Sequence, residues 1–258
     1  MNIYIWKENS LCFTAEQANS TVQLTQNWTP TAVSLETSTD WKTWSSYTIG
    51  DIITLSNIWD KVYMRNTSTS TTGFSSSSAT YEFVMSWSIA WSWDVTTLIN
   101  KNWTDTLTEG YCFNNLFLDC TSLTVAPELP ATTLTWWCYR DMFRRCSSLT
   151  YCPLLPATTL ANSCYYEMFS QCTSLETLPT LPATTLLMYS YAYMFNYCSK
   201  IKLSTTQTWE YQKSYRIPTT WTGSTSTNSL YNMFGNTWWT FTWTPSINTT
   251  YYTSNTVV

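Results

Sequence analysis

The feature that most constrains this chain is an internal repeat with a period of 26 residues. Four cysteines, from Cys120 to Cys198, follow one another at this interval. The units 121–146 and 147–172 are identical at 15 of 26 positions, and the units 147–172 and 173–198 at 13 of 26. A fixed period of this length is typical of solenoids, because a single unit cannot bury its apolar side chains and several must stack. We therefore expect a stack of repeats with a continuous core.

Each unit changes its apolar spacing halfway, which predicts two structural elements per unit. In the first unit, apolar residues alternate with others from Leu123 to Leu129. Pro127 in this run and Pro130 directly after it favour a short extended segment over a central antiparallel strand. From Leu134 to Cys146, the apolar residues recur at positions that match one face of a helix of about three turns. The repeats are therefore expected to combine short stacked strands with helices.

The residues before the repeats have a different sequence pattern. From residue 11 to about 90, short alternating or β-branched runs are separated by clusters of Asn, Asp, Ser and Thr, which favours a small β-sandwich. We expect a β-rich module over 1–90, an N-terminal cap with a partial repeat over 91–120, three repeats over 121–198, and a degenerate repeat with a C-terminal cap over 199–258. The expected fold class is α+β, a sandwich-like module followed by a leucine-rich-repeat-like solenoid of short stacked strands and helices.

The composition argues against several classes of function. The chain has no histidine, which excludes Ser-His-Asp and Cys-His catalysis and every zinc site that uses imidazole. A net charge of −4 with 12 Lys and Arg supplies no basic surface for nucleic acid. No apolar run approaches the roughly 20 residues of a membrane-spanning helix, and no secretory signal is visible. We expect no catalytic residues, no cofactor, no nucleic-acid partner and no membrane span.

The nine cysteines have three alternative explanations: buried thiols, disulfides or a metal site. Cys138 and Cys146 are eight residues apart, about 12 Å along a helix. This distance is too long for a disulfide, and the spacing is unlike the Cys-x-x-Cys pattern of zinc sites. Equivalent cysteines of adjacent units could form disulfides, but burial as small apolar side chains explains the same register. We favour buried thiols, keep disulfides as the alternative and expect no metal site.

The contents of tryptophan and glycine are also unusual, because the chain has 16 Trp and only 5 Gly. Some tryptophans stand where turns between strands need glycine: Trp28 follows Asn27 and Trp41 follows Asp40, in place of Asn-Gly and Asp-Gly. Our hypothesis is that most of the tryptophans, with Trp44 as an exception, are UGA codons that the source organism reads as glycine. The alternative is an aromatic-rich ligand surface.

Two recurring sequence motifs resemble those of a known protein family. Leu-Pro-Ala-Thr-Thr-Leu and Cys-Tyr-x-x-Met-Phe-x-x-Cys-x-Ser-Leu are similar to the repeats of BspA-type leucine-rich repeat surface proteins. The resemblance covers residues 111–199, and this chain departs from the pattern at Trp136, Trp137 and Ser190. Members of that family are typically bacterial cell-surface proteins implicated in adhesion. The resemblance therefore implies a curved parallel-strand solenoid with a cell-surface or extracellular location.

These features predict a non-enzymatic binding or adhesion protein, at the bacterial cell surface or secreted. Its solenoid would be presented to a protein or glycan on another cell or matrix. The alternative is a structural or receptor-binding component of a phage or an extracellular appendage, in which the repeats form a rigid arm. A third hypothesis, a carbohydrate-active enzyme, needs two carboxylates about 5 to 9.5 Å apart across a cleft, and no motif nominates such a pair.

A ligand is expected to bind where matching units differ, because such positions can change without disturbing the core. The candidate ligand-binding residues all lie beside the repeated extended segment: Val125, Glu128, Tyr151, Leu154, Thr177 and Thr180. Stacking of the units would join these positions into one extended surface.

The only cluster of basic residues is formed by Arg140, Arg144 and Arg145, which we interpret as the solvated outer face of a helix. Asp141 and its equivalent one unit later, Glu167, are interpreted as a surface stack of carboxylates and not as an acid/base pair. On this interpretation, Arg144→Ala should change the free energy of unfolding by no more than about 0.5 kcal/mol.

Overall fold

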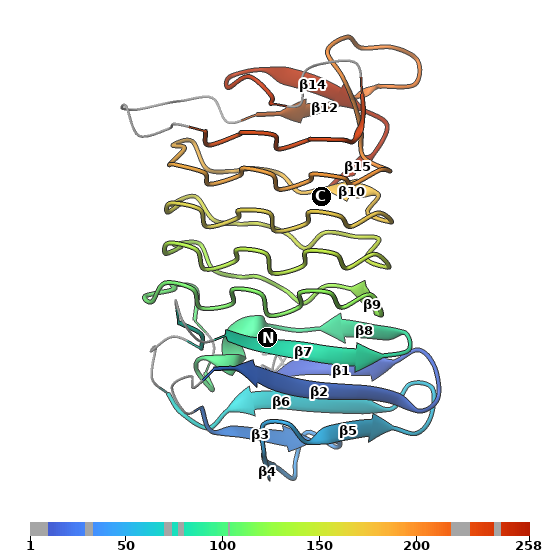
Figure 1. Ribbon diagram of the computed structural model, residues 1–258, viewed down its shortest axis with the longest axis vertical. Helices are drawn as coiled ribbons and strands as arrows, with labels where there is room; N and C mark the ends of the chain where they lie inside the picture. Colours follow the sequence, from blue (N-terminus) through green and yellow to red (C-terminus); the bar gives the residue numbers. More distant parts are fainter. Residues whose placement is uncertain are drawn as a thin grey trace, which may run out of the picture.

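The chain forms an elongated stack (Figure 1), with the N-terminal strands at one end, coils in the middle and the C-terminal strands at the other end. The computed structural model describes residues 10–28, 33–69, 74–76, 80–102, 104–217, 228–239 and 244–258, without the side chains of 238 and 239. Its elements in chain order are β1 (Leu11–Ala15), β2 (Ser20–Asn27), β3 (Leu35–Ser38), β4 (Ser45–Tyr47), β5 (Ile52–Leu55), β6 (Lys61–Asn66), β7 (Thr80–Ser86), β8 (Ile89–Ser92), the 3₁₀ helix η1 (Val95–Leu98), β9 (Leu123–Val125), β10 (Thr177–Leu178), β11 (Lys202–Ser204), β12 (Lys213–Arg216), β13 (Trp238–Trp239), β14 (Thr250–Thr253) and β15 (Thr256–Val257).

The N-terminal module has two sheets that share one core. The larger sheet has the strand order β4-β3-β6-β1-β8-β9, and the smaller one has the order β5-β2-β7. Buried and half-buried residues alternate over most of β2, because one face of its sheet packs on the core. Phe13 of β1 and Phe83 of β7 meet edge to face with 5.1 Å between ring centroids, and Trp91 of β8 packs against both. These three rings join the two sheets.

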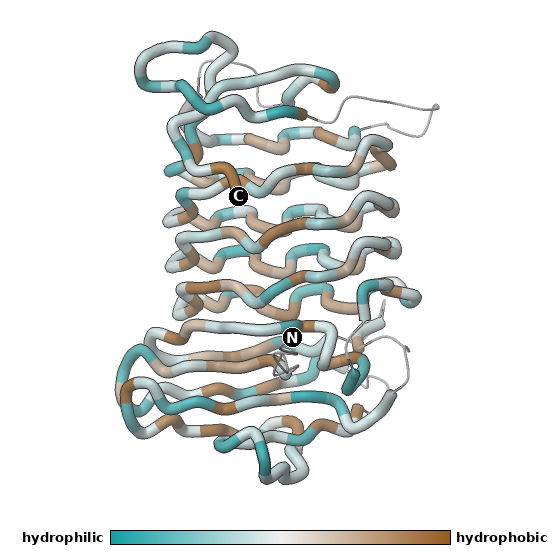
Figure 2. The backbone as a smooth tube through the Cα atoms, turned by 180° about the vertical axis from the view of Figure 1, so that it is seen from behind, coloured by the Kyte–Doolittle hydropathy of each residue, from teal (hydrophilic) through white to brown (hydrophobic). Residues whose placement is uncertain are grey.

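The larger sheet continues directly into the repeats. β9 pairs in parallel with β8, with Ile89 opposite Leu123, and the next coil follows through a parallel bridge between Val125 and Tyr151. The buried residues of the module and of the repeats belong to a single hydrophobic cluster. Seen from behind in Figure 2, apolar and polar residues alternate along each coil, as expected when every coil contributes to this core.

The second half of each unit is a run of tight turns, and the prediction of a helix there is wrong. No helix in the described part of the chain reaches seven residues, so the chain is mostly β and the expected α+β class is also wrong. The N–H groups of Met142 and Arg144 donate to carbonyls three residues earlier, at 3.4 and 3.1 Å. The N–H groups of Asp141 and Phe143 donate instead to carbonyls of the next coil, both at 2.9 Å. A helix would keep all these bonds within itself, whereas the turns use half of them to join the coils.

These turns need a backbone conformation that a helix excludes. Every fourth residue has a positive φ, as at Trp137 (58°), Asp141 (52°) and Arg145 (61°), whereas residues of an α-helix have φ near −63°. Apolar residues therefore recur with a period of four. Over three turns this differs from the helical period of 3.6 by only about one residue, and for this reason the sequence pattern resembled a helix.

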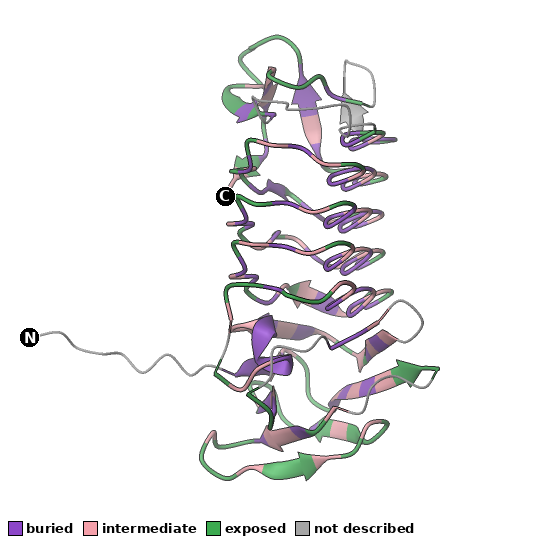
Figure 3. Cartoon of the chain, turned by 90° about the vertical axis from the view of Figure 1, so that its left-hand side faces the viewer, coloured by how far each residue is buried: buried purple, intermediate pink, exposed green. Residues whose placement is uncertain are grey.

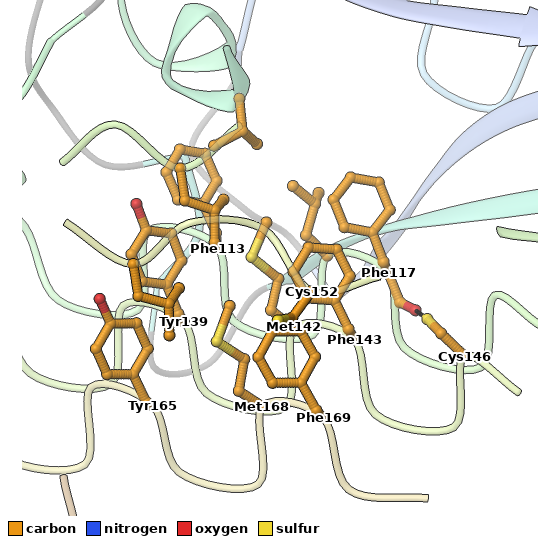
Figure 4. Close-up of a cluster of buried hydrophobic side chains, with 14 of the residues drawn as sticks. Phe113, Phe117, Tyr139, Met142, Phe143, Cys146, Cys152, Tyr165, Met168 and Phe169 are labelled. Atoms are coloured by element: carbon orange, nitrogen blue, oxygen red, sulfur yellow. Dashed lines mark hydrogen bonds between the residues drawn. The ribbon is translucent and has the colours of Figure 1, made fainter. Parts of the chain in front are cut away.

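Equivalent side chains stack on one another through the coils. Figure 4 shows the phenylalanine ladder, in which Phe117, Phe143 and Phe169 lie nearly parallel with 5.3 and 5.5 Å between successive ring centroids. A second ladder joins Tyr139 to Tyr165 at 5.8 Å. In Figure 3, buried residues line the inside of the coils and exposed residues follow their outer edges. The ladders therefore form the interior of the solenoid.

The cysteines are part of this interior. All nine are buried free thiols, which confirms the interpretation favoured from the sequence. The thiols of Cys146 and Cys172 donate to carbonyls of the preceding coil at 3.0 Å. Burial raises the pKa of the Cys164 thiol to about 12, so that it stays protonated at neutral pH. Cys146 and Cys172 thus serve as small donors between coils.

The C-terminal residues fold back onto the stack. β15 pairs in parallel with β10, and a four-stranded sheet has the order β12-β14-β11-β13. The side chain of Asn255 donates to the carbonyls of Glu176 and Lys200, both at 3.0 Å, and accepts from the N–H of Lys202 at 2.8 Å. Asn255 thus bonds the backbone of two successive coils and attaches the C-terminal end to them.

Replacing Phe169 with alanine should lower the free energy of unfolding by about 3 to 5 kcal/mol. The ring is fully buried between Phe143 at 5.5 Å and Phe195 at 5.6 Å, so the cavity would affect two neighbouring coils. Leu154→Ala is the control, because Leu154 is exposed, and it should change stability by about 0.5 kcal/mol or less. Urea unfolding monitored by circular dichroism measures both. Equal losses would contradict the ladder.

Candidate functional site

The six residues proposed from the sequence as ligand-binding are here called the strand face. Three of them are large apolar residues with a high exposed fraction of their surface: Val125 at 39 %, Tyr151 at 58 % and Leu154 at 63 %. Glu128 and Thr180 are exposed as well. Val125 and Tyr151 lie side by side on adjacent coils, joined by a parallel backbone bridge. The structure therefore leaves five of the six residues accessible to a partner.

Thr177, the sixth member of the strand face, is covered and only 1 % exposed. It lies in β10, where Thr256 of β15 is its pairing partner. Its hydroxyl accepts from the N–H of Cys152 at 2.8 Å and donates to the sulfur of the same residue at 3.1 Å. The C-terminal strand therefore covers Thr177 of the third unit, which the repeat alone does not reveal.

A hollow of about 600 Å³ lies beside Tyr151, where the C-terminal strand joins the coils. Lys200 and Lys202 line it. Lys200 is paired with Glu176 at 2.5 Å, and the ammonium of Lys202 lies 3.7 Å from the carboxylate of Glu210. Because each lysine has a carboxylate partner, these ion pairs leave little unbalanced charge for an anionic ligand.

The opposite part of each coil is the outer side of the turn runs 136–145, 162–171, 188–197 and 228–236, here called the turn face. A cluster of ion pairs joins its first two coils. Arg140 Nε lies 3.0 Å from Asp141 Oδ2, and Arg144 contacts both Asp141 at 3.4 Å and Glu167 at 3.2 Å.

This arrangement corrects the interpretation of the basic cluster. Asp141 is buried, and Arg144 is only partly exposed between its two carboxylate partners. The prediction of a solvated face is therefore wrong for Arg144 and Asp141, whereas Arg145 is exposed. Arg144→Ala is therefore expected to destabilise the fold and not to be nearly neutral, as the sequence alone predicted.

The environment of Asp141 shifts its protonation. Burial raises the pKa of Asp141 above its ordinary value, and the Glu167 carboxylate raises it further, while Arg140 and Arg144 act in the opposite direction. Since the folded-state pKa exceeds the unfolded one, the contribution of this group to stability falls as the pH rises through these values. Each carboxylate is engaged by an arginine, which suits a structural network between coils.

The turn face also contains a hollow that the sequence analysis missed. This aromatic hollow has a volume of about 580 Å³, and its lining combines aromatic and polar side chains: Trp137, Arg140, Ser163, Tyr166, Tyr189, Tyr193, Asn228 and Tyr231. The Tyr193 ring stands steeply against Tyr166 and Tyr231, with 5.6 and 5.3 Å between centroids and interplanar angles of 66° and 77°. The guanidinium carbon of Arg140 lies 4.5 Å from the centroid of the Trp137 ring.

The hollow arises from a column of equivalent residues, that is, residues at the same position of successive coils. Trp137, Ser163 and Tyr189 occupy the same position on three successive coils, as their backbone hydrogen bonds show: the N–H of Trp137 donates to Asn162 O, and that of Ser163 to Met188 O. The small serine stands between two aromatic residues, so the column lacks a ring at its centre. The relevant sequence signal was the replacement of Trp137 by Ser163 between sibling units, which the helix interpretation did not place on an outer column.

Two further features bear on chemistry. In the ranges that the structure describes, no group of three or more Cys, Asp and Glu side chains is placed to hold a metal ion. Among the same residues, there is no helix with the length and apolar character needed to cross a membrane.

Comparison with known proteins identified no relative. No family model matches the chain, and no curated protein or solved structure is significantly similar to it. The resemblance to BspA-type repeats therefore stays a prediction from the repeated sequence motifs. The function has to be inferred from the geometry of the strand face and the turn face.

Arg144→Ala should lower the free energy of unfolding at pH 7 by about 1 to 3 kcal/mol, because buried Asp141 would lose one ionic partner. The loss should shrink as the pH falls through the pKa of Asp141, because a protonated carboxyl needs no guanidinium. Arg145→Ala is the matched control, since its pair with Asp119 is exposed and worth about 0 to 1 kcal/mol. Denaturant unfolding of all three chains between pH 7 and about pH 4 measures the effect. A loss that does not change with pH would assign Arg144 a packing role.

Proposed function

We propose that this chain is a binding protein that presents the strand face of a rigid solenoid to a protein partner on another cell or matrix. The observation that carries the proposal is the group of exposed apolar side chains on adjacent coils: Val125, Tyr151 and Leu154. Soluble proteins seldom expose large apolar residues close together unless they contact a partner. The role in adhesion and the cell-surface or extracellular location rest on the resemblance to BspA-type repeats.

The scaffold behind this face is suited to binding. Each coil is joined to the next by backbone hydrogen bonds, and the ladders beneath are fully packed. A side chain held on such a scaffold loses little conformational freedom when it binds, so more of its contact energy remains as affinity. Rigidity therefore supports a role in presentation.

The residue types of the strand face favour a protein partner. Tyrosine is enriched among the residues that dominate the binding energy of protein interfaces, and such residues are typically surrounded by a polar rim. Tyr151 is the large aromatic residue of the strand face, and the exposed Glu128 and Thr180 are polar. We therefore assign Tyr151 as the main contact.

Adhesion of protein-coated beads to a panel of cells tests this function. Fluorescent beads coated with the chain should adhere to at least one type of bacterial or animal cell, and protease treatment of those cells should abolish adhesion. The double variant Tyr151→Ala with Glu128→Ala should reduce adhesion by about tenfold or more, with an unchanged thermal midpoint, because both side chains are exposed.

Tyr197→Ala serves as the matched control, because Tyr197 is an exposed tyrosine on the turn face. It should adhere like the unchanged chain. Beads that adhere no better than albumin-coated beads, or a double variant that adheres fully, would overturn the proposal. Adhesion that survives protease treatment would exclude a protein partner.

A further inference from the structure

We propose that the aromatic hollow of the turn face is a second binding site, which takes a neutral saccharide of one or two rings. It lies on a different part of the coils from the strand face and does not depend on the function proposed above. The size of the hollow, the charges around it and the mixture of side chains that line it all favour such a ligand.

The size of the hollow indicates a small ligand. Its volume of about 580 Å³ falls within the range of roughly 300 to 1,000 Å³ that is usual for small-molecule sites. A stable protein interface needs about 800 Å² from each partner, and such an interface would have to extend well beyond these side chains. A mono- or disaccharide matches the available space.

The charges around the hollow balance one another. Arg140 is the charged side chain of the lining, and it is paired with Asp141 at 3.0 Å. The neighbouring Arg144 is shared between Asp141 and Glu167. Two guanidinium groups therefore face two carboxylates, which leaves no net positive charge to attract a phosphate or another anion. This balance favours a neutral ligand.

The lining offers both kinds of contact that a sugar makes. The C–H faces of a pyranose pack against aromatic rings, and Tyr166, Tyr189, Tyr193 and Tyr231 supply such rings around the opening. The hydroxyl groups of a sugar need hydrogen-bond partners, which are available from the tyrosine hydroxyls and from Asn228. The amide of Asn228 already donates to the hydroxyl of Tyr189 at 3.2 Å, so the two polar groups are held beside each other.

Saturation-transfer NMR and calorimetry with four neutral disaccharides, maltose, cellobiose, lactose and chitobiose, test this site. At least one of them should bind in saturable fashion, whereas 3′-sialyllactose, which adds a negative charge to lactose, should bind no better than lactose. Ser163→Tyr should weaken binding by about tenfold or more, because it places a ring at the centre of the column. Tyrosine is compatible with this position, since Tyr189 has the same backbone conformation as Ser163, with φ of 55° at both residues.

The control is again Tyr197→Ala, which removes an exposed ring outside the lining and should leave the dissociation constant unchanged. Thermal midpoints confirm that both variants are folded. If none of the four disaccharides binds, or if Ser163→Tyr binds as well as the unchanged chain, the assignment is overturned. Tighter binding of 3′-sialyllactose than of lactose would overturn the neutral class of ligand. If the unchanged chain binds a disaccharide but does not adhere to any cell, the function proposed for the strand face is rejected and the saccharide site stands.

A second inference follows independently from the backbone of the N-terminal module. Outside the turn runs and the equivalent turns at 110–119, seven non-glycine residues in the described chain have positive φ: Asn19, Trp28, Trp41, Trp59, Trp87, Trp93 and Asn248. Asparagine tolerates this conformation better than other residues with side chains, whereas tryptophan is bulky and resists it. Five tryptophans therefore occupy positions that suit glycine. Trp137 also has a positive φ, but it lies in a turn run, where the equivalent residues Ser163 and Tyr189 adopt the same conformation, so this inference does not include it.

We infer that these five tryptophans are glycine in the protein that the source organism makes, because it reads UGA as glycine. Three of these side chains contribute little to the fold, because Trp28, Trp59 and Trp87 are 85, 72 and 61 % exposed. The indole N–H of Trp41 is buried without a hydrogen-bond partner. All five stand next to strands or in the connections between them, where turns are needed.

Two other tryptophans are the matched controls, because the structure uses their rings. Trp44 stacks under the Arg65 guanidinium at 3.6 Å, and Trp91 packs against Phe13 and Phe117 in the core. Neither has a positive φ. The sequence hypothesis had excepted Trp44, and the packing now adds Trp91.

The gene sequence tests this inference. UGA is expected at codons 28, 41, 59, 87 and 93, and UGG at codons 44 and 91. Peptide mass spectrometry of the protein isolated from its source should show glycine at the first five positions and tryptophan at the other two. For the chain as printed, Trp59→Gly should raise the thermal midpoint, whereas Trp44→Gly should lower it. UGG at the five codons would overturn the inference, as would UGA at codon 91 together with a stable Trp91→Gly variant.

Discussion

The hydrogen bonds between successive coils hold the rest of the structure in place. In each turn run, alternate N–H groups close a turn within the coil, as that of Met142 does, and the others reach a carbonyl of the next coil, as that of Phe143 does. Buried backbone groups must be paired, and this division pairs them without a helix or a long strand. It also places equivalent residues above one another, so that Phe143 stacks on Phe169. The ladders, the buried thiols and both candidate sites follow from that register.

Because the register is uniform, a change in one unit acts locally on the surface. On the turn face, Ser163 replaces a large side chain between Trp137 and Tyr189, and the result is the aromatic hollow. On the strand face, Val125 and Tyr151 differ between units and stand exposed beside each other. The same coils therefore offer a broad apolar surface on one side and a small polar and aromatic hollow on another. The two proposed sites would therefore take different kinds of partner above the same core.

Sequence reasoning succeeded where a property depends on a residue and its equivalents in neighbouring units. Tyr151 and Leu154 were placed on an exposed surface because they vary while the core positions do not, and both are exposed. It failed where a distant segment intervenes: Thr177 looked like Tyr151 in the alignment of units, but β15 covers it. It also failed for Arg144, whose partners Asp141 and Glu167 belong to two different coils, so that their contact depends on how those coils stack.

The sequence by itself determined that the chain stacks, with a period of 26 residues, and which side chains point inward, because only the inward positions keep their apolar character in every unit. It could not determine the backbone that carries them. Periods of 3.6 and 4 residues turn nearly the same side chains inward over three turns, so the pattern from Leu134 to Cys146 fitted a helix. The tertiary structure decided for turns, because the N–H of Asp141 and its equivalents bond to carbonyls on the neighbouring coil and not within their own. Bonds of this kind exist only once the coils are stacked, and they select the conformation that no single unit specifies.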